Sequence, residues 1–384
     1  AFTRFFKTAI TAYFPAFHVR NFLSGAVQNY EVIGKEAFNP KNYNTALGIL
    51  KGVDDVVELG GKKIATKQIK EALDKTFGGS SRYISDIGDY VEELAGKNFK
   101  VKPVSKARQI GNFIETYQKA VATVGSLRQG KSLKEAIELA EKAGFDYSKI
   151  TKFESKIMRR LIPFYTFARK NAGLQLATFK DNPERILNIK KAAEAIGNML
   201  GEKTTEEDIK GLPKWVLSGL GFKISGDKYL AQFGFAPEEF LGRINQPMQS
   251  ILISLNPLVK FPLESKMGRD FFRDQKITDI NSVAPATGEK LMQLKKEGKL
   301  PEWFEQTINL KTYVDSTGKR RYSASPKALH VLRNLPTARL QSSLEKMFDK
   351  DTEKVDKWLA FFTGAKVYDI DIEKQKYFDE RDLK

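Results

Sequence analysis

Apolar residues recur at helical spacing along most of this chain, and this periodicity restricts the fold more than any other feature of the sequence. Residues 105–125 show it most clearly, and Ser105 is a candidate N-cap for a helix there. The apolar positions of that segment fall on one stripe: Ile110, Phe113, Ile114, Tyr117, Val121 and Val124. The same spacing predicts further helices within or around residues 16–30, 69–73, 87–94 and 340–362.

Two helix boundaries are marked by residues with known capping roles. Ser132 and Glu135 are spaced as a capping box, in which each side chain accepts a hydrogen bond from the backbone amide of the other, and Gly144 is a typical stop for that helix. Asn182-Pro183-Glu184 combines a cap, a proline suited to the first helical position and an acid that complements the helix dipole. Residues 150–200 are therefore expected to form two or three helices.

Strand patterns are confined to two short segments. Residues 222–233 and 312–323 each contain a strand pattern on both sides of a polar turn, which predicts two β-hairpins. We therefore predict a mainly α fold, elongated or bundle-like, with one or two small hairpins and no central sheet. The expected organisation is an N-terminal helical region (1–104), a basic helical bundle (105–210), a mixed region (211–348) and a slightly acidic helical tail (349–384).

The formal net charge is +17, and much of it lies in two tracts. Residues 97–131 contain eight Lys or Arg and one acid, and residues 156–191 contain nine Lys or Arg and two acids. Such tracts suit sequence-independent contact with phosphates, although a Lys-rich solvated surface has the same composition. The candidate DNA contacts are Lys102, Lys106, Arg108, Lys156, Arg159, Arg160, Arg169, Lys170 and Lys180.

The first fourteen residues predict an amphipathic helix. One face is apolar and the other carries Arg4 and Lys7 without any acid. The apolar face comprises Phe2, Phe5, Phe6, Ile10, Tyr13 and Phe14. It could lie in a bilayer interface or dock on a neighbouring subunit, and we favour docking. The sequence contains no run of about 18 apolar residues, so it predicts no membrane-spanning helix. Because the first residue is Ala, we expect the segment to come from a longer chain.

The sequence contains no recognised catalytic or metal-binding pattern. There is no Cys, which excludes thiol nucleophiles and zinc–thiolate sites within these residues. His18 and His330 have no acid at ligand spacing, so each is predicted to be a surface or packing residue. Residues 197–204 fail the spacing of a phosphate loop, and residues 349–360 lack the glycine and the final Glu of a calcium loop. We predict no enzyme activity, cofactor or metal. A catalytic pair of carboxylates that only folding brings together remains an alternative, because spacing in sequence does not report spacing in space.

Five phrases, in order along the chain, resemble one family of proteins. They are Phe14 to Asn21, residues 114–150, Leu161-Ile-Pro-Phe-Tyr165 with Arg169-Lys-Asn171 and Asn182-Pro183, Leu255-Asn-Pro257 with Phe261-Pro-Leu-Glu264, and Leu359 to Ile372. Together they resemble the helical domain of large bacteriophage virion proteins of the tape-measure, ejection and large polyvalent type. The resemblance covers most of the chain. It implies no catalytic residue at any position of this sequence.

This resemblance implies a protein packaged in the capsid interior or tail and delivered with the genome into the host envelope. The expected partners are other phage virion proteins, further copies of the chain, double-stranded DNA bound without sequence preference, and the host membrane after ejection. The leading prediction is a non-enzymatic structural segment that helps to form a conduit. The first alternative is a nucleic-acid-binding accessory domain of a packaged virion enzyme such as an RNA polymerase, and the second is an enzyme with an unrecognised carboxylate site.

Overall fold

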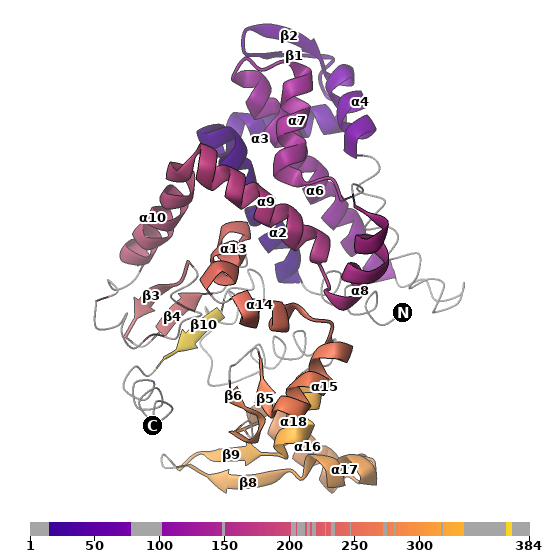
Figure 1. Ribbon diagram of the computed structural model, residues 1–384, viewed down its shortest axis with the longest axis vertical. Helices are drawn as coiled ribbons and strands as arrows, with labels where there is room; N and C mark the ends of the chain where they lie inside the picture. Colours follow the sequence, from indigo (N-terminus) through magenta and orange to yellow (C-terminus); the bar gives the residue numbers. More distant parts are fainter. Residues whose placement is uncertain are drawn as a thin grey trace.

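The computed structural model describes residues 15–77, 102–147, 150–200 and 366–370, and, apart from short gaps, residues 205–333 (Figure 1). These residues form mainly helices, and their strands make only antiparallel sheets of two or three short strands. The predicted fold class, mainly α with small hairpins and no central sheet, is confirmed. The predicted helices at residues 1–14, 87–94 and 340–362 lie outside the described residues.

The N-terminal part of the structure is built around α6 (Lys102–Arg128). Residues 120–127 of α6 are buried on every side. Gly125 shows why small residues are needed there, because an added Cβ would lie 2.7 Å from Ile33. The packing neighbours of α6 are α2 (Pro15–Ile33), η1 (Gly34–Phe38), α3 (Pro40–Lys51), α4 (Thr66–Phe77) and α7 (Leu133–Gly144). This core joins elements on both sides of the domain boundary that was expected after residue 104.

The start of α6 differs from the prediction in two respects. The helix begins at Lys102, so Ser105 lies within it and is not the N-cap. Pro103 fits this earlier start because the first turn of a helix needs no backbone N–H from it. In addition, Ile110 and Phe113 are about half exposed, at 50% and 48%. The predicted stripe is therefore half-buried at Ile114 and Tyr117 and fully buried only at Val121 and Val124, where neighbouring helices surround α6.

The predicted boundaries of the next helices are confirmed. Glu135 N donates to Ser132 Oγ at 3.3 Å and Ser132 N donates to Glu135 Oε2 at 2.8 Å, which completes the capping box of α7. Gly144 is the last residue of that helix. Asn182 separates α9 (Tyr165–Asp181) from α10 (Pro183–Leu200), as its sequence neighbours predicted.

Both predicted hairpins are present, and each gains a third strand from elsewhere in the chain. The first pairs β3 (Phe222–Ser225) with β4 (Lys228–Ala231), and β10 (Lys366–Asp369) joins β4 on its other side. The second pairs β8 (Lys311–Val314) with β9 (Arg320–Ser323), which also pairs with β7 (Ser282–Val283).

Two further strand pairs were not predicted. One is β1 (Val56–Leu59) with β2 (Lys62–Ala65), and the other is β5 (Arg269–Asp270) with β6 (Gln275–Lys276). Gly60 and Gly61 form the turn of the β1–β2 hairpin with φ of +58° and +74°, which glycine adopts readily. These two short pairs add to the two hairpins that the sequence predicted.

The second half of the described chain is a series of short helices, which Figure 1 shows running from beneath α9 to the foot of the molecule. They are α13 (Ala236–Asn245), α14 (Pro247–Ser254), α15 (Pro257–Met267), α16 (Pro285–Lys296), α17 (Glu302–Ile308) and α18 (Pro326–Arg333). Four of them begin with proline, which suits the first helical position. A small core of Ile308, Ala324, Ala328 and Leu329 holds the lower helices and sheet together.

A buried polar contact joins α2 to α9, and α9 in turn to α13. Gln175 Nε2 donates to Glu31 Oε1 at 2.8 Å and to Oε2 at 2.9 Å, and both side chains are buried. Arg185 Nη1 donates to the Glu31 carbonyl oxygen at 2.7 Å, and Asn171 Nδ2 donates to the Ala236 carbonyl oxygen at 2.8 Å. Burial raises the pKa of Glu31 to about 8, against the opposing effect of the Gln175 hydrogen bond.

We therefore predict that Glu31 makes stability depend on pH. Between pH 4.5 and about 8 the unfolded carboxyl has lost its proton while the folded one keeps it. The free energy of unfolding should thus fall as pH rises, by up to about 1.4 kcal/mol per pH unit. Glu31→Gln cannot ionise, so its urea-unfolding profile should lose this part of the slope and show a gain in stability at pH 8. Parallel pH profiles for the two proteins would contradict the prediction, and Glu71→Gln on the exposed face of α4 is the control.

Candidate interface at the corner between α8 and α9

The structure gathers several of the predicted DNA contacts at one corner. Lys156 lies in the π-helical turn η2 (Glu154–Met158), Arg159 and Arg160 lie in α8 (Arg159–Leu161), and Arg169 and Lys170 lie in the second turn of α9. Lys180 is separate, about 15 Å further along α9 at the helical rise of 1.5 Å per residue. Lys102, Lys106 and Arg108 lie in the first turns of α6, and their side chains are outside the described part of the structure. The amphipathic set at residues 2–14 is also outside it.

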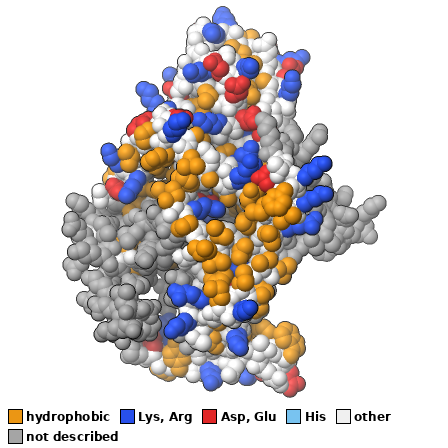
Figure 2. All heavy atoms as spheres, viewed as in Figure 1, with side chains coloured by type: hydrophobic (Ala, Val, Ile, Leu, Met, Phe, Trp, Pro, Cys, Tyr) orange, Lys and Arg blue, Asp and Glu red, His pale blue; other side chains and the backbone are white. Residues whose placement is uncertain are grey.

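Large apolar side chains share this corner with the cations. Figure 2 shows them as an orange area over α8, α14 and α15, with blue side chains at its margin. We call this area the apolar face. Its members are at least 37% exposed: Phe153, Ile157, Leu161, Phe164, Met248, Ile251, Leu258, Leu263 and Met267. The sequence did not predict this surface, because apolar residues at helical spacing were expected to be packed against neighbours.

Within the two segments that form the apolar face, the exposed charges all have one sign. In residues 150–170 and 247–267 the only acids are Glu154 and Glu264, and both are buried. The exposed cations of these segments are Lys152, Lys156, Arg160, Arg169 and Lys266. A polar partner with phosphate groups and an anionic partner with an apolar layer would both find complementary charge here.

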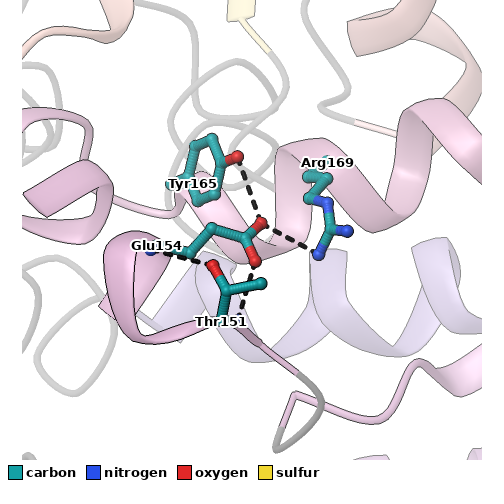
Figure 3. A network of polar contacts seen from close by, with 4 residues as sticks. All are labelled: Thr151, Glu154, Tyr165 and Arg169. Atoms are coloured by element: carbon teal, nitrogen blue, oxygen red, sulfur yellow. Dashed lines mark hydrogen bonds and ion pairs between the residues drawn. The ribbon is translucent and has the colours of Figure 1, made fainter. Parts of the chain in front are cut away.

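A network centred on Glu154 holds the corner in place (Figure 3). Thr151 N donates to Glu154 Oε2 at 2.8 Å, and Glu154 N donates to Thr151 Oγ1 at 3.2 Å, so the two residues form a capping box. The other carboxylate oxygen, Oε1, accepts from Tyr165 Oη at 3.2 Å and lies 2.9 Å from Arg169 Nη1. One carboxylate therefore ties the start of this helical segment to the start of α9. The first of these contacts, the Thr151 backbone hydrogen bond, is the largest cause that lowers the pKa of Glu154.

Asn256 joins the two halves of the apolar face by capping two helices at once. Its side chain Nδ2 donates to the Arg160 carbonyl oxygen at 2.9 Å, and its backbone N donates to the Leu161 carbonyl oxygen at 2.7 Å. Its Oδ1 accepts from Leu258 N at 3.0 Å and so caps the start of α15. Two phrases on which the family resemblance depends, at residues 161–165 and 255–257, therefore meet in space.

The two histidines occupy different environments. His330 is buried, with Nε2 at 3.0 Å from Glu264 Oε2 and Nδ1 at 3.9 Å from Asp270 Oδ2, and its ring stacks on Phe261. No local pattern predicted these acidic neighbours, because they belong to α15 and β5, far from His330 along the chain. His18 is half-buried beside Gly111, and burial lowers its pKa. Among the described residues no group of three or more His, Asp or Glu could hold a metal ion.

Comparison with known proteins found no matching family, no similar curated protein and no similar solved structure. Within the described ranges, no helix has both the length and the apolar character needed to cross a membrane.

We predict that Glu154 stabilises the corner only while it is ionised. Because its folded pKa is lower than the ordinary value of 4.5, its contribution is complete above that pH and is lost as pH falls through the folded pKa. Glu154→Gln should lower the melting temperature at pH 7, and the difference from the unsubstituted protein should disappear in acid. Tyr165→Phe removes one hydrogen bond and keeps the carboxylate, so its melting curves should retain the pH dependence. A difference for Glu154→Gln that is equal at pH 3 and pH 7 would show that ionisation is irrelevant.

Proposed function

We propose that this chain is a non-enzymatic structural segment of a bacteriophage virion protein of the tape-measure or ejection type. In this proposal it is packaged in the capsid or tail, is delivered with the genome, contacts DNA, and helps to form a conduit through the host envelope. Further copies of the chain and other virion proteins are its partners. The observation that carries the DNA contact is the corner between α8 and α9, where exposed cations are gathered and both nearby acids are buried.

The arrangement of the corner supports contact without base recognition. Lys156 and Arg160 extend from a frame that Glu154 and Asn256 hold in place. Cations beside phosphates release counterions, which gives affinity that depends on salt and not on sequence. Arg169 is shared with Glu154, so part of its charge is already balanced within the protein. The exposed Lys156 and Arg160, together with the half-buried Lys170, are therefore the strongest candidates for phosphate contact.

The resemblance to phage proteins supplies the biological setting of this proposal. Two of its phrases, residues 161–165 and 255–257, form the Asn256 junction, which gives a physical reason for their occurrence together. A packaged virion enzyme with a DNA-binding accessory domain would carry the same interface. Polymerase motifs in flanking sequence would favour that alternative, and coiled-coil repeats would favour a tape measure.

We predict salt-sensitive binding of duplex DNA by the whole chain. Fluorescence anisotropy with two unrelated duplexes should give equal affinities that fall steeply between about 50 and about 200 mM salt. The triple variant Lys156→Glu, Arg160→Glu and Lys170→Glu should weaken both duplexes equally and make the slope of log affinity against log salt shallower by about 2 to 3.

The matched control reverses three exposed cations of α4, Lys67, Lys70 and Lys75, which changes the net charge by the same amount at a distant site. It should bind DNA more tightly than the corner variant does. Equal loss in the two variants would show that net charge alone acts, and no binding by the unsubstituted chain at low salt would contradict the DNA contact.

A further inference from the structure

We propose that the apolar face docks on the surface of an anionic lipid bilayer. This inference deepens the proposed function, and it rests on that function for its setting at the host envelope. It concerns residues 153–164 and 247–267 and does not involve the amphipathic segment at residues 1–14. The partner is identified by the combination of exposed apolar side chains with charge of one sign.

The apolar face is larger than the scattered exposed residues of an ordinary surface. Met248, Ile251, Leu258 and Met267 are each more than half exposed, and Phe153 is 59% exposed. The Asn256 hydrogen bonds to Arg160 and Leu161 place the α8 and α15 members beside each other. Contiguous apolar surface of this kind normally marks an interaction site.

The α15 helix shows that the exposure has a regular geometric basis. Glu264 and Pro257 are buried, and Glu264 Oε1 accepts from Phe271 N at 2.9 Å while its Oε2 lies 3.0 Å from His330 Nε2. The buried carboxylate fixes the rotation of the helix, and Leu258, Leu263, Lys266 and Met267 on its remaining sides are exposed to solvent. The chain therefore places an acid inside and apolar and basic side chains outside, which reverses the usual arrangement of a surface helix.

The charges distinguish a bilayer from a second copy of the chain and from DNA. A two-fold contact would set the face against itself, so its cations would oppose each other, and neither of its two segments carries an exposed acid to pair them. DNA would engage the cations but would leave the exposed Ile, Leu and Met without an apolar partner. An anionic bilayer offers headgroup phosphates to Lys156, Arg160 and Lys266 and an acyl boundary to the apolar side chains.

Docking of this kind places the face in the interface and does not require a spanning helix. Amphipathic surfaces of this type enter the headgroup and acyl boundary by about 5–10 Å. The Asn256 junction keeps α8 and α15 in one surface during such contact, and the Glu154 network ties the segment before α8 to α9.

The test is co-sedimentation of the whole chain with vesicles of phosphatidylcholine alone or of phosphatidylcholine with about one third phosphatidylglycerol. The unsubstituted protein should bind the anionic vesicles more tightly than the neutral ones. The variant Ile251→Asn, Leu258→Asn and Met267→Asn should bind anionic vesicles at least about tenfold more weakly, because each substitution removes apolar area from the acyl boundary. The matched control Val53→Asn, Trp303→Asn and Val314→Asn changes equally exposed residues elsewhere and should bind like the unsubstituted protein.

The DNA assay separates failure of this inference from failure of the proposed function. If the bilayer is the partner, the Asn variant of the apolar face keeps its DNA affinity while it loses vesicle affinity. If it binds anionic vesicles as tightly as the unsubstituted protein, the inference is overturned whatever the DNA result. It is also overturned if vesicles do not bind and the face instead mediates self-association, seen as a dimer that the same variant converts to monomer. The chain could bind vesicles with the expected dependence on anionic lipid and on the apolar side chains, and yet fail to bind DNA. That result would support this inference and contradict the proposed DNA contact. Circular dichroism checks that each variant keeps its helical content.

Discussion

The structure depends on the complete burial of the second half of α6. From residue 120 to residue 127 no side of this helix faces solvent, and α2, α3, α4 and α7 all pack around it. Small side chains make this arrangement feasible, since a Cβ at Gly125 would overlap Ile33. Because α2 is held against α6, the carboxylate of Glu31 is held at the contact with α9. The position of α9 then sets the corner on which the proposed interface lies.

Buried polar side chains determine how neighbouring elements are oriented relative to each other, which apolar packing alone would not specify. Glu31, Glu154 and Glu264 are all buried, and each holds a second element through directed hydrogen bonds or an ion pair. Leaving such a group without its partner would cost about 1–3 kcal/mol or more, so each contact restricts the relative placement of two elements. Removing these acids from the surface also leaves the exterior of the corner positive.

This distribution of charge and apolar area is the physical basis of both proposals. A basic corner suits phosphates, and the adjoining apolar area suits a partner that also has an acyl layer. A protein delivered with a genome through an envelope would meet both chemistries.

The sequence by itself determined the local structure. Ser132 with Glu135, Gly144 and Asn182-Pro183 predicted helix ends correctly, because capping acts between residues within one turn. Polar turns predicted both hairpins for the same reason. The sequence also located the basic tract at residues 156–191, although it could not say which of its cations would share a surface.

Only the tertiary structure decided which residues meet. Gln175 and Glu31 are separated by 144 positions, and Asn256 and Arg160 by 96, so no local pattern links them. The same separation along the chain explains why the sequence did not predict the third strands β7 and β10 or the acidic neighbours of His330. Helical spacing predicted where apolar stripes occur but not whether a neighbour covers them, as the exposed Ile110 and Phe113 show. Coverage is a property of the packed chain, and it is the uncovered apolar side chains that define the candidate interface.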